Sequence, residues 1–139
     1  IKKLVELLDD ESGLTRGYAA YALAKYADKG LTEPKALEKL VKLLDDEKSL
    51  TRGYAIIAIA VYAVRKYIDR NALEKLVRLL DDNDKEVCGL AALALAKYAE
   101  RGLTSPEVMM KIKDLLGDKN EWVRKCAFTA LKKYVKRKK

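Results

Sequence analysis

The residues of this chain that could do chemistry are acids and bases set at a fixed spacing. Three aspartates are each followed, six residues later, by an arginine: Asp10 and Arg16, Asp46 and Arg52, Asp118 and Arg124. Carboxylates that act as general acids or bases must reach the reacting group in a pocket. An aspartate at a turn can instead cap the following helix, and an arginine offers several donors to neighbouring acids. We therefore interpret both sets of residues as structural and not as a charged active site.

Metal and covalent chemistry have few candidate residues in this sequence. The chain contains no histidine, which removes the commonest metal ligand and the usual base of a catalytic triad. Its two cysteines, Cys88 and Cys126, are 38 residues apart, and because both fall in apolar segments we expect buried, unreactive thiols. We therefore predict that the protein is not an enzyme and uses no cofactor, no metal and no small-molecule substrate.

The composition favours a helical protein without a membrane segment. The 139 residues are 50% hydrophobic and 36% charged, with seven glycines and only two prolines to punctuate turns. The longest run without a charge, residues 53–64, is 12 residues long and too short to span a bilayer, and no signal peptide is visible. We expect a single domain, residues 1–139, in the cytoplasm. The absence of glutamine beside so much charge favours a thermophilic source.

The sequence repeats itself every 36 residues. The motif Leu-Leu-Asp-Asp occupies residues 7–10, 43–46 and 79–82 and returns in altered form at 115–118. A tyrosine column follows the same step, at Tyr26, Tyr62, Tyr98 and Tyr134. We expect these rings to pack between helices, with the hydroxyl bonded to a loop carbonyl or to water. Such periodicity is typical of an array, which we divide into units of about 1–34, 35–70, 71–106 and 107–139, the first beginning inside its first helix.

Each unit contains two helical segments of different character. In the second unit, residues 35–44 mix apolar and charged positions as an amphipathic helix does, whereas the segment from about Leu50 to Tyr67 has almost no polar face. A helix that is apolar all round must be covered on more than one side. Gly30 and Gly102 stand where left-handed caps would end the second helices of units one and three. The second unit has Lys66 there, so we expect its second helix to run longer.

These units resemble HEAT repeats, which are helix–turn–helix units with an aspartate at the turn and Val-Arg six residues further on. The closest match is the last unit, with Asp118, Val123, Arg124, Ala127 and Leu131, and the resemblance covers essentially the whole chain. It implies an all-α fold, a right-handed α–α superhelix (solenoid) of about four two-helix repeats. In the family, the aspartate and the arginine form a ladder between neighbouring turns. Cys88 replaces the arginine of unit three, so the ladder is expected to break there.

The second helices also carry an apolar side that faces away from the first helices. In HEAT-like stacks the second helices line the concave surface, so the resemblance implies that this side forms an apolar stripe on that surface. The stripe consists of Tyr21, Ile57 and Leu93, and Tyr18 and Tyr54 lie beside it. We predict all five as protein-binding candidates. A contiguous apolar patch usually indicates an interaction site. The alternative is that tight curvature buries the stripe between the second helices.

A glycine column accompanies this stripe. Gly17, Gly53 and Gly89 each lie one helical turn before a stripe residue. Glycine inside a helix costs about 1 kcal/mol relative to alanine, so a repeated glycine indicates a need for close approach. We interpret the column as the place where a partner approaches the second helices.

Positive charge is concentrated in the last unit. Residues 107–139 contain eleven lysines and arginines against four acids, a net charge of +7 in a chain whose net charge is +8. The basic patch consists of Lys132, Lys133, Lys136 and Arg137. One interpretation is a solvated terminal cap, because end repeats need a polar outer face. The other is a patch for phosphate backbones or for an acidic partner.

Together these observations predict a non-catalytic protein–protein interaction or scaffold module that uses the concave surface of its second helices. The partner is either another protein or a second copy of the chain, as in a homodimer. The alternative is a nucleic-acid-binding HEAT-like protein that uses the basic last unit. An end cluster without a matching row along the units fits a duplex poorly and would bind it only weakly. No membrane partner is expected.

Overall fold

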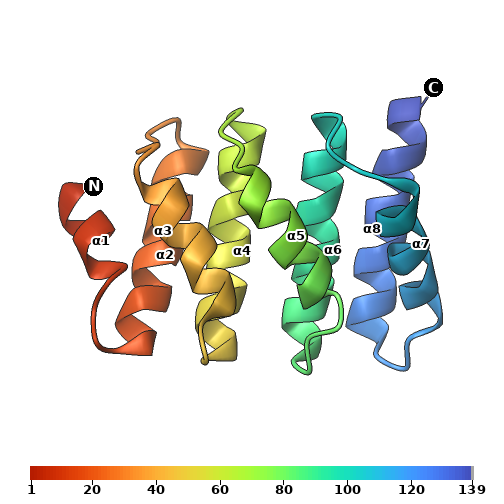
Figure 1. The fold of residues 1–139 in the computed structure, drawn as a ribbon, viewed down its shortest axis with the longest axis horizontal. Coiled ribbons are helices and arrows are strands. Elements are labelled where there is room, and N and C mark those ends of the chain that lie inside the picture. Colours follow the sequence, from red (N-terminus) through yellow and green to blue (C-terminus); the bar gives the residue numbers. More distant parts are fainter. Residues whose placement is uncertain (139) are drawn as a thin grey trace. The chain divides into compact units, whose positions relative to one another are not determined.

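The chain folds into helices joined by short turns. The computed structural model describes the backbone of residues 1–138 and the side chains of residues 1–135, and in that part of the chain it contains helices and no strand (Figure 1). In chain order the elements are α1 (Lys2–Leu7), α2 (Gly13–Asp28), α3 (Ala36–Lys42), the 3-10 helix η1 (Leu43–Asp45), α4 (Ser49–Val64), α5 (Arg70–Leu79), α6 (Lys85–Glu100), α7 (Pro106–Asp114), the 3-10 helix η2 (Leu115–Gly117) and α8 (Glu121–Lys138). The predicted all-α class is confirmed. None of these described helices is long and apolar enough to cross a membrane.

The helices form two compact units, one from Ile1 to Ala72 and the other from Leu73 to Lys139. The N-terminal unit contains α1 to α4 and the start of α5, and the C-terminal unit contains the rest of α5 and α6 to α8. In the N-terminal unit α2 packs along α4, and in the C-terminal unit α6 packs along α8 (Figure 1). Each pair joins the second helices of successive repeats, so within each unit one repeat stacks on the next.

A left-handed residue follows each of the second helices α2, α4 and α6. Gly30 has φ 91°, Gly102 has φ 81°, and Lys66, at the equivalent position, has φ 75°. The backbone N–H groups of Lys66 and Tyr67 donate to carbonyls inside α4 at 2.9 Å, which are the hydrogen bonds that close a helix end. The expectation that this helix runs longer is therefore wrong. It stops at Val64, because those bonds hold the lysine in the left-handed conformation.

Apolar residues of the first helices form the core with the second helices. Leu40 of α3, Leu76 of α5 and Ile112 of α7 expose at most 1% of their surface, and α3 packs on α4 as α7 packs on α8. The second helices contribute a column of buried alanines, at Ala19, Ala55, Ala91 and Ala127. Such small side chains let two helices pack closely.

The tyrosine column has the predicted structural role at Tyr62. Its ring is fully buried. Its hydroxyl accepts the backbone N–H of Glu33 at 3.1 Å and donates to the carbonyl of Glu33 at 3.2 Å, so a ring of α4 fastens the loop that precedes α3. Tyr98 is equally buried, whereas Tyr26 exposes 42% of its surface. The column therefore has one environment in the middle repeats and another in the first.

Replacing Leu76 by alanine should lower the free energy of unfolding by about 2–5 kcal/mol, because a fully buried side chain is removed and a cavity remains. Chemical denaturation followed by circular dichroism measures this loss. Arg78→Ala, an exposed change in the same helix, is the control and should stay within about 0.5 kcal/mol of the parent. An equally small loss for Leu76→Ala would contradict the packing of α5 described above, because it would show that Leu76 is not part of the core.

Candidate functional site

Arginine side chains connect successive turns in the N-terminal unit. Arg16 donates from Nη1 to the backbone carbonyls of Asp10, at 2.7 Å, and Glu11, at 3.1 Å. Its Nε donates to Oδ2 of Asp46, in the turn of the next repeat, at 2.8 Å. Arg52 repeats the backbone contact, with Nη1 2.8 Å from the Asp46 carbonyl oxygen. An arginine of this ladder therefore holds its own turn through the backbone, and Arg16 also holds the next turn through a carboxylate.

The aspartates of the ladder shape the turns and do not cap the second helices. Oδ1 of Asp46 accepts the N–H of Lys48 at 3.0 Å, which is an Asx turn, and Asp10 makes the same contact with Ser12 at 2.9 Å. The N-cap of α2 is Ser12, whose hydroxyl accepts the N–H of Thr15 at 3.3 Å. The expected capping role is therefore corrected, because these two aspartates lie two residues before the cap.

The ladder lowers the pKa of Asp46. Burial of the carboxylate acts to raise this pKa, but the hydrogen bonds from Arg16 and from the N–H of Lys48, with the charges of Arg16 and Arg52, outweigh the effect of burial. A carboxylate whose pKa is lowered by folding stabilises the folded state above its pKa in the unfolded chain. That contribution is lost as the pH falls through the lowered value, so the contact between the turns is sensitive to acid.

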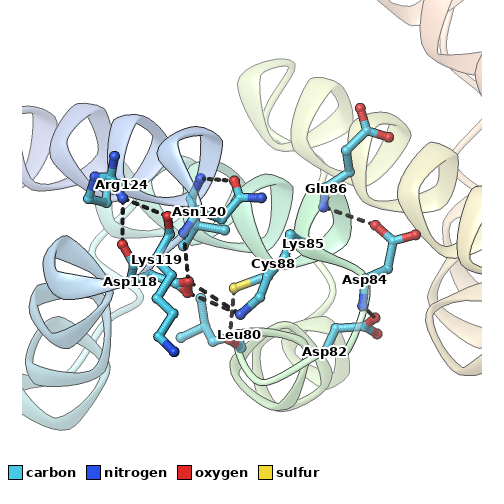
Figure 2. A network of polar contacts seen from close by, with 11 residues as sticks. Leu80, Asp82, Asp84, Lys85, Glu86, Cys88, Asp118, Lys119, Asn120 and Arg124 are labelled. Carbon is cyan, nitrogen blue, oxygen red and sulfur yellow. Dashed lines mark hydrogen bonds and ion pairs between the residues drawn. The ribbon is translucent and has the colours of Figure 1, made fainter.

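In the C-terminal unit a lysine makes the contact that the missing arginine would make. Cys88 stands in the arginine column, and its thiol donates to the carbonyl of Leu80 at 2.9 Å (Figure 2). Lys85, one turn earlier on α6, places Nζ 3.0 Å and 3.3 Å from the two carboxylate oxygens of Asp118. Arg124 then holds the Asp118 carbonyl at 2.7 Å. The expectation that the ladder breaks at Cys88 is wrong between the third and fourth repeats, because Lys85 replaces the arginine.

Both cysteines are buried in surroundings that keep them unreactive. Cys88 exposes 1% and Cys126 3% of its surface. Burial raises the pKa of the Cys88 thiol, and burial with a smaller contribution from Cys88 raises the pKa of Cys126 to about 11. Thiols with raised pKa values carry little thiolate, the reactive form, near neutral pH. Among the described residues, no group of three or more acidic, histidine or cysteine side chains is placed to hold a metal ion.

Three of the predicted protein-binding residues form a tyrosine cluster on α2 and α4, made of Tyr18, Tyr21 and Tyr54. The ring centroid of Tyr54 lies 5.9 Å from that of Tyr18 and 4.9 Å from that of Tyr21. Tyr18 exposes 55% and Tyr21 38% of its surface, and Nζ of Lys25 lies 5.3 Å from the Tyr21 centroid. The cluster is therefore an exposed aromatic surface.

An apolar row runs along the whole of α4 beside this cluster. Its members, which we call the α4 stripe, are Leu50, Tyr54, Ile57, Val61 and Val64. Leu50 and Val64, at its ends, expose 43% and 48% of their surface, and the three residues between them are half-buried. Steps of four and three residues place all five on one face of the helix. Leu50, Val61 and Val64 go beyond the residues predicted from the sequence, although the same spacing identifies them.

Leu93, the fifth predicted candidate, lies in the C-terminal unit. It is half-buried on α6, and the equivalent position on α8 is the exposed Thr129. The structure therefore gathers Tyr18, Tyr21 and Tyr54 on neighbouring helices, with Ile57 one turn along α4, and places Leu93 in the other unit.

Two glycines of the column, Gly17 and Gly89, serve packing inside their units. A Cβ on Gly17 would lie 3.1 Å from Oγ1 and 3.3 Å from Cα of Thr51 in α4. A Cβ on Gly89 would lie 2.5 Å from Nε1 of Trp122 and 2.9 Å from Sγ of Cys126 in α8. The interpretation of these two glycines as the place where a partner approaches is therefore wrong, because the next second helix already occupies that space. This packing leaves the tyrosine cluster exposed.

The basic patch lies partly within the described side chains. Lys132 is exposed, with Nζ 5.5 Å from the ring centroid of Phe128, and Lys133 is half-buried. The side chains of Lys136 and Arg137 lie outside the described residues. The described part of the patch therefore consists of two lysines, one of which rests on an aromatic ring.

Two-helix units at a 36-residue step, stacked second helix on second helix, define an α-solenoid repeat protein. A family model described as HEAT repeats matches residues 1–96. The chain belongs to the HEAT-repeat family. Repeat proteins of this class are generally non-catalytic scaffolds for protein interactions, and no family of enzymes is indicated. A search of curated proteins found no match.

The solved structures similar to this chain include engineered and designed repeat proteins. An engineered protein of the Northeast Structural Genomics Consortium aligns with a TM-score of 0.75 and 27% identity, over 99% of this chain and 67% of its own. A designed armadillo repeat protein aligns with a TM-score of 0.76 and 35% identity, over 94% of this chain and 63% of its own. Another designed armadillo repeat protein, in complex with the peptide (KR)4, aligns with a TM-score of 0.69 and 32% identity, over 94% of this chain and 62% of its own. The chain spans about two thirds of the length of these proteins.

A methyl group at Gly89 should disturb the contact between α6 and α8. In Gly89→Ala the new atom displaces the indole nitrogen of Trp122, which donates to the Glu86 carbonyl at 3.4 Å. Overpacking costs about 1–3 kcal/mol, and alanine regains roughly 1 kcal/mol of helix propensity, so the melting temperature should fall. Trp122 is the only tryptophan, and its fluorescence should shift to the red. Gly117→Ala, with open space around it, is the control; an unchanged emission in Gly89→Ala would contradict the packing.

Acid should weaken the ladder. Because the pKa of Asp46 is lowered by folding, the free energy of unfolding should fall as the pH drops below about 4, the ordinary aspartate range. Asp46→Asn removes the charge that faces Arg16, so it should be less stable at neutral pH and show a flatter dependence on acid. Urea denaturation at a series of pH values measures both effects. Equal slopes for parent and variant would contradict a contribution from this contact.

Proposed function

We propose that the protein is an interaction module whose N-terminal unit binds an α-helix of a partner on the face formed by the tyrosine cluster and the α4 stripe. The observation that carries this proposal is the contiguity of exposed and half-buried apolar side chains on two helices that pack together. A contiguous apolar patch on a soluble protein usually has an interaction to cover it. The scaffold role that is general for this class of fold supports the same conclusion.

The spacing of the α4 stripe favours a helical partner over an extended peptide. Its residues follow one another at steps of 4, 3, 4 and 3, the heptad spacing by which two helices pack knobs into holes. An extended chain would instead be held by main-chain hydrogen bonds and by pockets for alternate side chains. From Leu50 to Val64 the stripe rises about 21 Å at 1.5 Å per residue, which suits a partner helix of about four turns.

The tyrosine cluster supplies the contacts expected at the centre of such an interface. Tyrosine is enriched among the residues that dominate binding energies, because its ring buries a large area at a small cost in conformational entropy. Tyr54 belongs to both the cluster and the stripe, and its contacts with Tyr18 and Tyr21 order this surface before a partner arrives.

A strongly basic peptide fits this face less well than an apolar helix. One similar designed armadillo repeat protein was solved with the peptide (KR)4. The α4 stripe contains no carboxylate, and Lys25 stands over the neighbouring ring of Tyr21. The positive charges of such a peptide would find no carboxylate on the stripe, so the proposed partner is an amphipathic helix that presents its apolar side.

Nucleic-acid binding by the basic last repeat has weaker support. A phosphate backbone requires cations distributed along its path. In the described part of α8, Lys132 rests on the ring of Phe128, and Lys125 lies 3.2 Å from Glu121. These lysines already have local partners, so the interaction module is the better supported function.

A synthetic amphipathic helix with leucine at the heptad a and d positions tests the proposal. Fluorescence anisotropy of the labelled peptide should show saturable binding to the parent protein. Tyr18→Asp and Ile57→Asp should each weaken binding by about tenfold or more, because a charge enters an apolar contact, with helicity and melting temperature little changed. Leu31→Asp places the same charge at a residue that is 53% exposed outside this face and should bind as the parent does.

Light scattering over a range of protein concentrations tests whether the bound helix belongs to a second copy of this chain or to another protein. A dimer that both Tyr18→Asp and Ile57→Asp dissociate would identify a second copy of the chain, and a monomer would leave the face to another protein. Equal peptide binding by all variants, or unfolding of both aspartate variants of this face, would contradict the proposal.

A further inference from the structure

Apolar side chains of the last repeat are exposed at positions that other repeats bury. Phe128 exposes 58% of its surface and Val135 54%. Their equivalents on α2 and α6 expose at most 2% and are Ala20, Ala27, Ala92 and Ala99. Leu116, just before α8, exposes 39%. Its equivalents expose at most 3% and are Leu8, Leu44 and Leu80. An end repeat usually needs a polar outer face, so this apolar surface indicates a contact.

The buried equivalents lie on the side of α2 that contacts the next repeat. On that side Nε of Arg16 lies 2.8 Å from Oδ2 of Asp46, and a Cβ on Gly17 would touch Thr51 of α4. Ala20 follows Arg16 by four residues, which places it on the same side of the helix. The same side of the last repeat carries what we call the α8 outer face, which consists of Leu116, Arg124, Phe128, Leu131 and Val135.

A groove between α7 and α8 adjoins the α8 outer face. It has a volume of about 300 Å³ and is lined by Pro106, Met109, Met110, Lys113, Leu131 and Tyr134. Leu131 belongs to both the groove and the outer face. Methionine side chains adapt their shape to an apolar neighbour. The last repeat therefore offers a hollow, largely apolar surface to another helix.

The first repeat has the matching uncovered side. None of the residues of α1 is buried, whereas Leu40, the equivalent of Leu4 on α3, is fully buried. Tyr26 exposes 42% of its surface. Its equivalent Tyr62 is fully buried and bonds the loop that precedes α3. We call this side the α1 outer face, and its residues are Leu4, Val5, Leu7, Asp10 and Tyr26.

We propose that copies of this chain associate head to tail, with the α8 outer face of one copy against the α1 outer face of the next. The contact repeats between molecules the packing of one repeat on the next that each unit contains. It joins two different surfaces and is therefore heterologous. It does not use the tyrosine cluster or the α4 stripe, so this proposal and the one above can fail separately.

The arginine ladder supplies a polar contact for this junction. Arg124 donates from Nη1 to the carbonyls of Asp118, at 2.7 Å, and Lys119, at 2.9 Å, as Arg16 does in its own turn. In Arg16 this arrangement presents Nε to the aspartate of the next turn. Asp10 makes the Asx turn of the ladder aspartates, so Asp10 of a second copy is the acceptor that fits Arg124. The junction continues the ladder from one molecule to the next.

Charge favours this junction over a symmetric dimer through α8. Residues 107–139 contain eleven lysines and arginines against four acids, a net charge of +7. Residues 1–34 contain five against six, a net charge of −1. Two last repeats placed face to face would repel each other, whereas a last repeat against a first repeat brings no such charges together.

Light scattering over a range of protein concentrations tests the junction. A head-to-tail contact leaves a free outer face on each pair of molecules, so the mass should grow beyond two copies as the concentration rises. Phe128→Asp and Tyr26→Asp should each weaken association by about tenfold or more, because a charge enters an apolar contact. Thr129→Asp, at an exposed residue equivalent to Leu93 and not on the α8 outer face, is the control and should associate as the parent does.

Mixing the two variants shows which faces meet. Phe128→Asp retains the α1 outer face, and Tyr26→Asp retains the α8 outer face. Each variant alone should stay a monomer, and an equimolar mixture should form pairs that grow no further. Circular dichroism checks the fold of every variant. Val135→Asp, at a second exposed residue of the α8 outer face, should behave as Phe128→Asp does and replaces it if that variant unfolds.

An aspartate variant tests the ladder contact separately. Asp10→Asn keeps a side-chain oxygen for the N–H of Ser12 and removes the charge that faces Arg124 of the neighbouring copy. Association should weaken by about threefold or more, and added salt should reduce the difference from the parent. Asp28→Asn removes the same charge at an exposed residue outside the α1 outer face and should leave association unchanged.

Three results would overturn the assignment. A monomer at every concentration up to about 1 mM would show that the two faces do not bind each other. A dimer formed by Tyr26→Asp alone would indicate contact between two α8 outer faces. Association that Tyr18→Asp and Ile57→Asp abolish, and that Phe128→Asp leaves intact, would assign it to the face proposed above for a helix.

Discussion

The contact between one second helix and the next is the constraint on which the other features depend. In each unit a glycine, Gly17 or Gly89, removes the side chain that would keep the two helices apart. The resulting separation lets Arg16 reach the carboxylate of Asp46 in the following turn. It also brings the rings of the tyrosine cluster together in the N-terminal unit. The ladder and the aromatic surface are therefore consequences of the same close packing.

Much of the fold follows from periodicity, because a residue that recurs at a fixed step meets the same surroundings each time. Leu40, Leu76 and Ile112 belong to the core on this ground alone, and the structure buries all three. Periodicity does not predict a contact that depends on how far a side chain can reach, or a backbone conformation that depends on local hydrogen bonds. Lys85 replaces an arginine from a different column, and Lys66 adopts the conformation of a glycine.

The candidate site could be predicted only in part, for a related reason. A glycine inside a helix indicates that another surface approaches closely, but it does not show whether that surface belongs to the same chain or to a partner. The sequence alone therefore assigns Gly17 to a partner, whereas the structure gives it to α4.

Lys66 has a consequence for how the surface of a repeat array can diversify. Its φ of 75° belongs to a region that L-residues enter at a cost of about 1–2 kcal/mol, and Gly30 and Gly102 avoid this cost at the equivalent positions. The helix-closing hydrogen bonds hold the backbone there whatever the side chain. Folding therefore accepts a charged side chain next to the exposed Val64. Where backbone hydrogen bonds alone fix the conformation of a residue, a repeat array can change the side chain on its surface without changing its shape.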